Sequence, residues 1–449
     1  MKKVIALLLA VVLVFALAAC GSTGSNASSK APAGSTGSNA PAENGSGSGS
    51  EAPAENGNAS SDIKIGVILL GDENEGYTYA HIEGIREAMA TLGIPEEQVI
   101  WKYSIPEDET CYDTACDLVD KGCSVIFSNS YSHQSYMVQA AEENPDVIFC
   151  PATGDTAAVC GLPNVKNYFN NTYESRYVSG VVAGMKLKEL IDGDKLTEKN
   201  FDENGNVKIG YVGAYPYAEV VSGYTAYYLG VKSIVENVVM DVQYTNSWFD
   251  ITAEGEVANA LVARGCCMIS QHADSTGAPT AVQTLLDAGT TVYCVGYNVD
   301  MLSVAPTAAL TSAQNNWAVY YTYALGLAIQ GMASEIATDW AKGYNEGAVQ
   351  ISALGESCAA GTAEKVAEVE AALKDGSLKV FDTTKFTVDG KAVDSYEFDF
   401  STMNADFTAV QYQGPVVNVI SDGYFHESEY RSAPYFDLRI DGITELNAF

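Results

Sequence analysis

Short apolar runs alternate with longer stretches of helical periodicity through most of the chain, and this alternation limits the folds available to it. The first apolar run, Ile63–Leu70, is followed by a polar loop and a helical stretch from about Tyr79 to Leu92. The same unit recurs before the run Val147–Pro151. Strands alternating with helices of about 10–15 residues indicate βαβ units and a parallel sheet. The repeated units predict strands at Val99–Tyr103 and Ser124–Asn129 and helices at Thr110–Lys121 and Gln134–Glu143.

The pattern restarts at Val207–Gly213, after a long helical stretch, Glu174–Ile191, that joins the two sets of units. We therefore expect an α/β protein with two doubly wound, Rossmann-like lobes. Ligands bind at the carboxyl ends of strands in open α/β sheets, so the expected site is a cleft between the lobes. The second set predicts strands at Met240–Tyr244, Met268–Gln271 and Thr291–Gly296 and helices at Ala218–Glu236, Ala253–Arg264 and Pro279–Ala288.

The lobe boundaries follow from where the pattern breaks. We expect the first lobe to comprise residues 62–172 and about 296–332, and the second to comprise about 173–295 and 333–449. A helix is predicted at Trp317–Gly331, and added strands are predicted at Lys379–Val388 and Ala409–Val419.

The N-terminus has the features of a secretory signal. Lys2 and Lys3 precede the apolar run Val4–Ala19, which is short for a bilayer span and ends at Cys20. The segment Leu17–Cys20 resembles the lipobox of bacterial lipoproteins, which implies cleavage after residue 19 and a lipid on Cys20. The alternative is plain secretion with cleavage nearby. Residues 21–61 are rich in Gly, Ser, Ala and Asn and predict a flexible tether, so we expect a lipid-anchored protein on the outer face of a bacterial cell membrane.

The charge balance excludes some partners. Among 449 residues, 57 acidic side chains stand against 24 basic ones, giving a formal net charge of −33. Such a polyanion is repelled by nucleic acid, and its field disfavours highly charged anionic ligands such as nucleotides. Neutral ligands are unaffected.

Cysteine and histidine patterns give no metal or catalytic site. None of the ten cysteines forms a C-x-x-C pair, and the four histidines lack ligand spacing. A disulfide between Cys111 and Cys116, or one involving Cys160, stays open. The segment Gln271–Ser275 holds a His, an Asp and a Ser, but neighbours on a short loop rarely adopt triad geometry. We interpret it as a ligand-contacting loop, and predict neither enzymatic activity nor a cofactor.

Aromatic residues follow strands of both lobes. Tyr77 and Tyr79 come after the acidic loop Gly71–Gly76, which lacks phosphate-binding patterns, and Trp248 and Phe249 follow a strand of the second lobe. Aromatic side chains facing one another across a cleft can stack on a flat ring, while buried Asp, Asn or His groups pair with its polar edge. The alternative is that these aromatics only line the core.

Several segments together carry a family resemblance. Gly76–His81 resembles a G-W-T-Y-x-H segment, Asn246–Asp250 resembles N-T-W-F-D, and Gln271–Ser275 resembles Q-H-T-D-S. The chain resembles the basic membrane protein family of ABC-transporter substrate-binding lipoproteins. This resemblance implies a type I periplasmic-binding fold, a purine nucleoside or related ligand, and permease and ATPase partners. Further matching segments are Asn171–Gly180, Gly213–Tyr217 with Glu219-Val220, Gly296–Met301, and Asn316-Trp317 with Tyr320-Tyr321.

The resemblance also implies roles for individual residues. Tyr77 and Trp248 correspond to ring-stacking positions. The nucleoside-binding branch has a Lys where this chain has Asn315, and the loss of this ribose-holding group argues for a free nucleobase such as adenine. The expected polar contacts are His272, Asp274 and Asp300, and the loop Tyr131–Ser132 is expected to line the cleft.

Two alternatives to a purine importer stay open: a receptor that signals without transport, and a binder of another small polar solute such as a sugar. The tail diverges from the family from about Ala333, with an apparent insertion around Phe386–Phe400.

Overall fold

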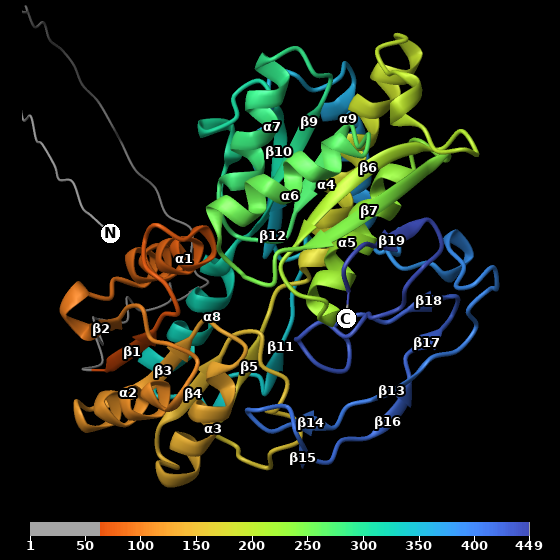
Figure 1. Ribbon diagram of the computed structural model, residues 1–449. Helices are drawn as coiled ribbons and strands as arrows, with labels where there is room; N and C mark the ends of the chain where they lie inside the picture. The colour runs from red at the N-terminus through yellow and green to blue at the C-terminus, as the bar shows by residue number, and fades with distance from the viewer. Residues whose placement is uncertain (1–62, 449) are drawn as a thin grey trace, which may run out of the picture. The chain divides into compact units, whose positions relative to one another are not determined.

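The computed structural model describes residues 63–448, which contain two α/β lobes (Figure 1). The first lobe is built on a parallel sheet with the strand order β2–β1–β3–β4. Its strands are apolar on both faces, because Ile65 and Val67 pack beneath one helical layer and Ile68 and Ile126 beneath the other. The elements are β1 (Lys64–Ile68), α1 (Gly76–Leu92), β2 (Val99–Lys102), α2 (Glu109–Asp120), β3 (Cys123–Ser128), α3 (His133–Glu143) and β4 (Ile148–Pro151).

The second lobe is built on a seven-stranded sheet with the order β12–β10–β9–β8–β6–β7–β19. All neighbouring strands are parallel except β10 and β12. Its elements are α4 (Thr172–Asp192), β6 (Val207–Gly213), α5 (Ala218–Lys232), β7 (Val238–Tyr244), α6 (Ile251–Ala263), β8 (Met268–Gln271), α7 (Gly277–Asp287), β9 (Tyr293–Tyr297), β10 (Ala309–Asn315), β12 (Val349–Ile351), α9 (Thr362–Lys374) and β19 (Ile443–Glu445).

The chain passes back to the first lobe later than the sequence predicts. Residues 296–315 stay in the second lobe, since β9 and β10 are neighbouring strands of its sheet. Then α8 (Trp317–Ile329) packs against α1, and β11 (Asp339–Trp340) pairs with β5 (Asn167–Tyr168). The run that forms β10 is rich in small and polar residues, so it lacks the apolar pattern that reveals a strand.

The 3-10 turns are η1 (Glu96–Gln98), η2 (Glu198–Asn200), η3 (Met301–Ser303), η4 (Ala333–Glu335) and η5 (Thr383–Lys385).

The C-terminal tail forms short hairpins in place of the two longer strands predicted. The segment Lys379–Val388 contains the turn η5 and no strand, so that prediction is wrong. Within Ala409–Val419 there are two short strands, which pair with different partners. Polar turns interrupt the apolar residues here, so no continuous strand can form. The tail strands are β13 (Glu397–Asp399), β14 (Thr402–Met403), β15 (Val410–Tyr412), β16 (Val416–Asn418), β17 (Ile420–Ser421) and β18 (Tyr424–Phe425).

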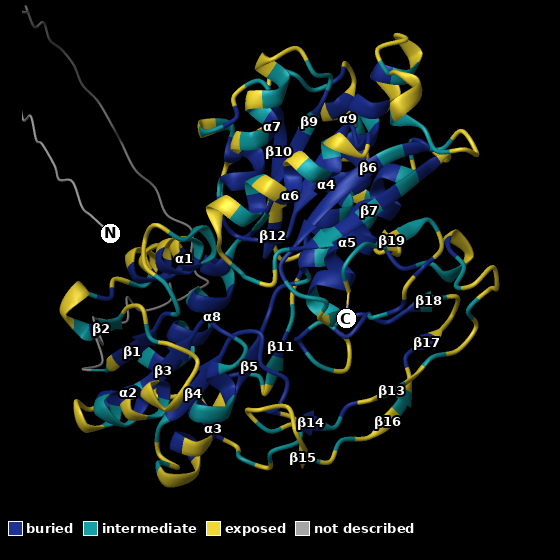
Figure 2. Cartoon of the chain, viewed as in Figure 1, coloured by how far each residue is buried: buried dark blue, intermediate teal, exposed yellow. Residues whose placement is uncertain are grey.

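Burial follows this architecture. The buried residues concentrate in the two sheets and the helices that cover them, whereas much of β13–β16 is intermediate or exposed (Figure 2). The nine cysteines of residues 63–448 are all free, so the disulfide options at Cys111, Cys116 and Cys160 are not realised there.

The expected signal peptide, the lipid-bearing Cys20 and the tether 21–61 lie outside the described residues. Among residues 63–448, no helix combines the length and the apolar composition that a membrane crossing requires.

Candidate functional site

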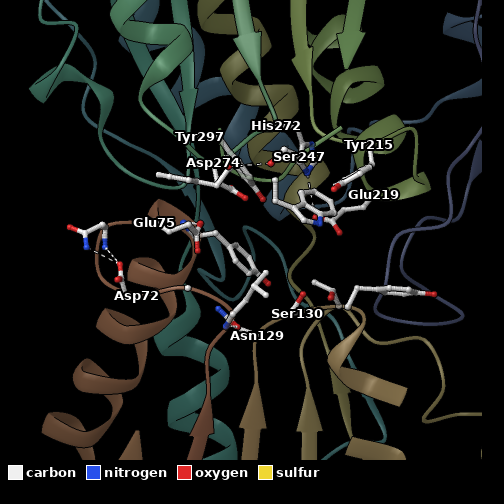
Figure 3. Close-up of a pocket in the computed structure, with 18 of the residues that line it drawn as sticks. Asp72, Glu75, Asn129, Ser130, Tyr215, Glu219, Ser247, His272, Asp274 and Tyr297 are labelled. Carbon is white, nitrogen blue, oxygen red and sulfur yellow. Dashed lines mark hydrogen bonds and ion pairs between the residues drawn. The ribbon is translucent and has the colours of Figure 1, made fainter. Parts of the chain in front are cut away.

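A cavity of about 420 Å³ lies between the lobes, at the carboxyl ends of strands from both sheets. Its volume is within the range of about 300–1,000 Å³ that is usual for small-molecule sites. Labelled residues of the two lobes face one another across it in Figure 3. The lining residues come from the loops after β1, β2, β3, β4, β6, β7 and β8, from the first turns of α1 and α5, and from the end of β9: Leu70, Gly71, Asp72, Asn74, Glu75, Tyr77, Ser104, Asn129, Ser130, Tyr131, Thr153, Tyr215, Glu219, Ser247, Trp248, Phe249, His272, Asp274 and Tyr297.

The first-lobe wall begins with the loop that leads into α1. The Glu75 carboxylate caps this helix by accepting hydrogen bonds from the backbone N–H groups of Tyr77 and Thr78, each at 2.8 Å. Burial raises the pKa of Glu75. A Cβ atom at Gly76 would lie 3.1 Å from the Asp274 carbonyl oxygen, so glycine allows this helix to touch the second lobe closely.

Tyr77 contributes an aromatic ring to this wall. Its ring contacts the edges of His81 and Trp317, with centroid separations of 4.6 Å and 6.1 Å. Its hydroxyl is buried and has no hydrogen-bond partner among the described residues. A buried hydroxyl without a partner is costly, so a ligand polar group is the natural partner for it.

The other side chains of this wall are held by the lobe itself. Asn129 accepts a hydrogen bond from the Leu70 N–H at 2.8 Å and donates one to the Thr78 hydroxyl at 3.0 Å. Tyr131 donates its hydroxyl proton to Asp155 at 2.9 Å. These bonds fix the positions of Asn129 and Tyr131 before any ligand binds.

The second-lobe wall is a group of aromatic rings. Trp248 and Tyr215 meet in an edge-to-face arrangement with a centroid separation of 5.3 Å. Behind them, His272 lies 5.0 Å from the ring of Tyr297. The Arg176 guanidinium is buried 3.6 Å from the centre of that ring and donates to the Gln271 carbonyl, which places a fixed positive charge behind the wall.

Two carboxyl groups of the second lobe have strongly shifted acidities. Burial raises the pKa of Glu219 to about 7, partly offset by Arg176. Burial, with the nearby carboxyl groups of Glu75 and Glu254, raises the pKa of Asp274 well above its usual value. Burial lowers the pKa of His272, which lies 3.4 Å from Glu219 through Nε2, so this imidazole is neutral near pH 7.

This arrangement suits a flat, uncharged ligand with polar edges. Aromatic rings line both walls, four acidic residues lie among the lining residues, and none of the described lining residues is Lys or Arg. A carboxyl group that titrates near pH 7 can either donate or accept a hydrogen bond. A phosphate would meet several acids and no basic partner. Within residues 63–448, no group of three or more His, Cys, Asp or Glu side chains could hold a metal ion.

The structure brings five of the nine predicted ligand-binding residues to the cavity. They are Tyr77, Tyr131, Trp248, His272 and Asp274.

The other four, Tyr79, Ser132, Asp300 and Asn315, are not among the lining residues. Tyr79 lies two residues after Tyr77 on α1 and is 40% exposed, because successive helical residues point in different directions. Asp300 caps η3 by accepting from the Leu302 N–H, and the Ser132 N–H donates to Glu107. Asn315 accepts hydrogen bonds from Asn170 and Thr172 at the crossing between the lobes. Its side chain therefore lies outside the cavity lining, where a ribose-binding group would have to be.

Sequence reasoning did not select Glu219, Tyr215, Tyr297 or Asn129. Tyr215, Glu219 and Tyr297 lie in segments that carry the family resemblance. Asn129 ends a predicted strand. Position at a strand's carboxyl end was therefore a usable signal for Asn129 and Tyr297. Nothing in the sequence shows that Glu219 becomes partly buried, with a side chain only 18% exposed.

The comparisons with known proteins agree with this architecture. The family model for PnrA-like ABC transporter substrate-binding proteins, the Bmp family, matches residues 64–380. The chain belongs to this family. The resemblance to basic membrane proteins is confirmed, and membership implies a small-molecule ligand and a permease partner. Members are transport binding proteins, so the chain is a binding protein and not an enzyme.

Individual relatives differ in what their names say they bind. The chain is 30% identical over 325 residues to a purine-binding protein of Brucella abortus, which covers 72% of this chain and 84% of the relative. It is 31% identical over 291 residues to a putative ABC transporter glucose-binding protein of Haloferax volcanii, covering 65% and 66%. A solute-binding protein structure from Aeropyrum pernix superposes with a TM-score of 0.58 at 16% identity, covering 71% of this chain and 93% of that one. The expected type I periplasmic-binding fold is thereby confirmed.

Proposed function

We propose that this substrate-binding protein captures a purine nucleobase between its lobes and delivers it to an ABC permease. The observation that carries the proposal is the composition of the cavity wall, which combines aromatic faces from both lobes with buried or partly buried carboxyl groups and no described Lys or Arg. Purine rings stack on aromatic faces, and their N–H groups can donate to carboxyl oxygens such as those of Glu219 and Asp274. The purine-binding relative in Brucella supports the same ligand class.

A free base is favoured over a nucleoside. The resemblance implies that nucleoside-binding members hold ribose with a lysine, and no described Lys lines this cavity. Asn315 does not carry this argument, because its side chain is bonded at the crossing between the lobes.

Calorimetric titration tests the ligand. The compact unit Gly57–Phe449 is stripped of any carried ligand by unfolding and refolding, then titrated with adenine, guanine, hypoxanthine, adenosine, guanosine and glucose. We expect micromolar or tighter binding of a base, with its nucleoside at least about tenfold weaker, or about 1.4 kcal/mol. Equal binding of the nucleoside contradicts the nucleobase assignment. Binding of glucose alone contradicts the purine assignment and favours the ligand class named for the Haloferax relative.

We further propose that Cys20 carries a lipid that holds the protein on the outer face of a bacterial cell membrane. The support is the lipobox resemblance of Leu17–Cys20 and the following tether, in residues outside the described part. In cells fed an alkyne-labelled fatty acid, the wild-type protein should incorporate the label and Cys20→Ala should not. Equal labelling of the two proteins contradicts this assignment.

A further inference from the structure

Residues 381–448 lie beyond the family match, which ends at residue 380. Their base is part of the second lobe, since Phe381, Phe425 and Phe436 belong to its hydrophobic core and β19 extends its sheet beside β7. From there the tail runs to the first lobe, where β14 and β15 lie near α3 (Figure 1). The tail therefore contacts both lobes that form the cavity.

A nearly buried ion pair joins the tail to Asp155 of the first lobe, a residue that bonds the cavity wall. Arg431 Nη1 lies 3.2 Å from Asp155 Oδ2, and the two side chains are only 11% and 8% exposed. The same Asp155 oxygen accepts the hydrogen bond from Tyr131, and its other oxygen accepts one from Gln134 at 3.0 Å. Arg431 and the wall residue Tyr131 therefore contact the same carboxylate oxygen, so Arg431 helps to fix the position of Tyr131 through Asp155.

Aromatic packing holds both ends of this link. The Arg431 guanidinium lies 5.3 Å from the ring centre of Phe398 and 5.6 Å from that of Phe400, both in the tail. On the cavity side, Phe407 stacks on the Tyr131 ring with a centroid separation of 6.2 Å and an interplanar angle of 13°. Phe407 sits in the hairpin of β14 and β15 with a φ of 56°, which is unfavourable for a side chain of its size.

A third contact ties the tail to the strand pair at the crossing. The Ser432 N–H donates to the Asp339 carboxylate, which belongs to β11 on the first-lobe side. In strand β15, where Tyr412 pairs with Thr402, the Tyr412 hydroxyl lies 3.5 Å from Glu142 of α3. The tail therefore contacts the first lobe at α3, at the loop after β4 and at β11.

We propose that residues 381–448 form an interlobe strap, in which Arg431 and Phe407 position Tyr131 and hold the two lobes together over the ligand. Loss of the Arg431 charge leaves Asp155 buried without its ion-pair partner while the lobes are together, whereas separation of the lobes exposes it to water. The open arrangement is then favoured, and a bound ligand escapes faster.

Two measurements on the unit Gly57–Phe449 test the strap. This inference deepens the proposed function, because it concerns the same cavity, but small-angle scattering of the ligand-free protein needs no ligand. Arg431→Gln and Phe407→Ala should each give a larger radius of gyration than wild type. For the tightest-binding purine of the calorimetric panel, stopped-flow dissociation should be about tenfold faster in Arg431→Gln.

Matched variants separate positioning from general damage. Arg439→Gln removes an arginine whose partner, Glu445, lies in the same lobe, and Val416→Ala shortens an apolar side chain of the tail that is 60% exposed. Both should keep the wild-type radius and rate. Arg431→Lys should restore much of the wild-type radius, and Arg431→Gln with Asp155→Asn should recover part of it, because the unpaired charge is gone.

The strap is refuted if Arg431→Gln, folded by circular dichroism, keeps the wild-type radius of gyration and dissociation rate. Should Arg431→Gln fail to fold, the test uses Phe407→Ala instead, because Phe407 is exposed and its loss should not prevent folding. An unchanged radius of gyration in Phe407→Ala then overturns the proposal. Failure of every purine to bind leaves the scattering result intact, so it overturns the proposed ligand and not the strap.

Discussion

The two walls of the cavity differ in how much of their hydrogen-bonding capacity is already used. In the first lobe, Glu75 caps α1, Asn129 is bonded through both its oxygen and its nitrogen, and Tyr131 is bonded to Asp155. In the second lobe, Glu219 and Asp274 each make one side-chain hydrogen bond within the described part of the chain.

This difference separates shape from recognition. A wall whose polar groups are already bonded supplies a rigid surface, and the Tyr77 hydroxyl is its main buried group without a partner in residues 63–448. A wall with spare hydrogen-bonding capacity discriminates among ligands, because a mismatched ligand leaves its buried polar groups unsatisfied. Selectivity should therefore depend mostly on the second lobe.

The largest expected effect is on the binding of a charged ligand, because both walls carry acidic side chains. Adenosine monophosphate should bind at least about a hundredfold more weakly than adenine, because its phosphate would be buried among carboxyl groups without a basic partner. Competition calorimetry measures this difference. Equal affinities would mean that a cationic group outside the described lining reaches the cavity.

The second effect isolates the aromatic face of the second lobe. Trp248→Ala should weaken purine binding by about 1–3 kcal/mol, since it removes a stacking surface. Trp101→Ala is the matched control, because Trp101 stacks on Tyr103 at the edge strand β2. Unchanged affinity in Trp248→Ala, measured by calorimetry on folded protein, would exclude a stacking role.

The third effect tests Glu219, a partly buried acid of the second lobe, through its contribution to stability. The folded pKa of Glu219, about 7, exceeds its usual value of 4.5, so this group costs stability as the pH rises from about 4.5 to about 7. Glu219→Gln cannot ionise and should therefore exceed wild type in unfolding free energy by about 1–2 kcal/mol at pH 8, with little difference at pH 4.

Urea unfolding at both pH values makes this comparison. The exposed Glu256 on α6 provides the control, and Glu256→Gln should show the same small change at pH 4 and pH 8. A pH-independent effect of Glu219→Gln would show that its carboxyl is not desolvated.

The smallest effect concerns the first lobe. Tyr77→Phe should weaken binding by about 0.5–1.5 kcal/mol without lowering stability, because its hydroxyl has no partner in the ligand-free protein. Tyr168→Phe should lower stability without weakening binding, since the Tyr168 hydroxyl forms a hydrogen bond with that of Tyr321 at 2.8 Å inside the lobe. Thermal unfolding and calorimetry on both variants give the two readouts. A loss of stability without a loss of affinity in Tyr77→Phe would remove this residue from ligand binding.

The fold was predictable because the spacing of apolar residues within a short segment distinguishes a strand from a helix, as in the strand segments Ile63–Leu70 and Val207–Gly213. The ends of these strands also predicted where the ligand cavity lies. Strand β10 was missed, since its small and polar residues carry no strong period, and this shifted the predicted lobe boundary.

The candidate site was predictable only in part, for a different reason. Trp248, His272 and Asp274 follow strands directly, so the topology fixes their location. By contrast, the partial burial of Glu219 and the bonding of Asn315 at the crossing depend on packing between segments far apart in the chain. The tail's contact with Asp155 is likewise long-range and has no local signature.

A crystal structure of the unit Gly57–Phe449 with the tightest-binding purine tests the central claim most directly. We expect the ring in the cavity between the lobes, in contact with Trp248 and Tyr77, with its N–H groups directed at Glu219 or Asp274. A purine bound outside this cavity, or within it but away from Trp248 and both carboxyl groups, would contradict the account.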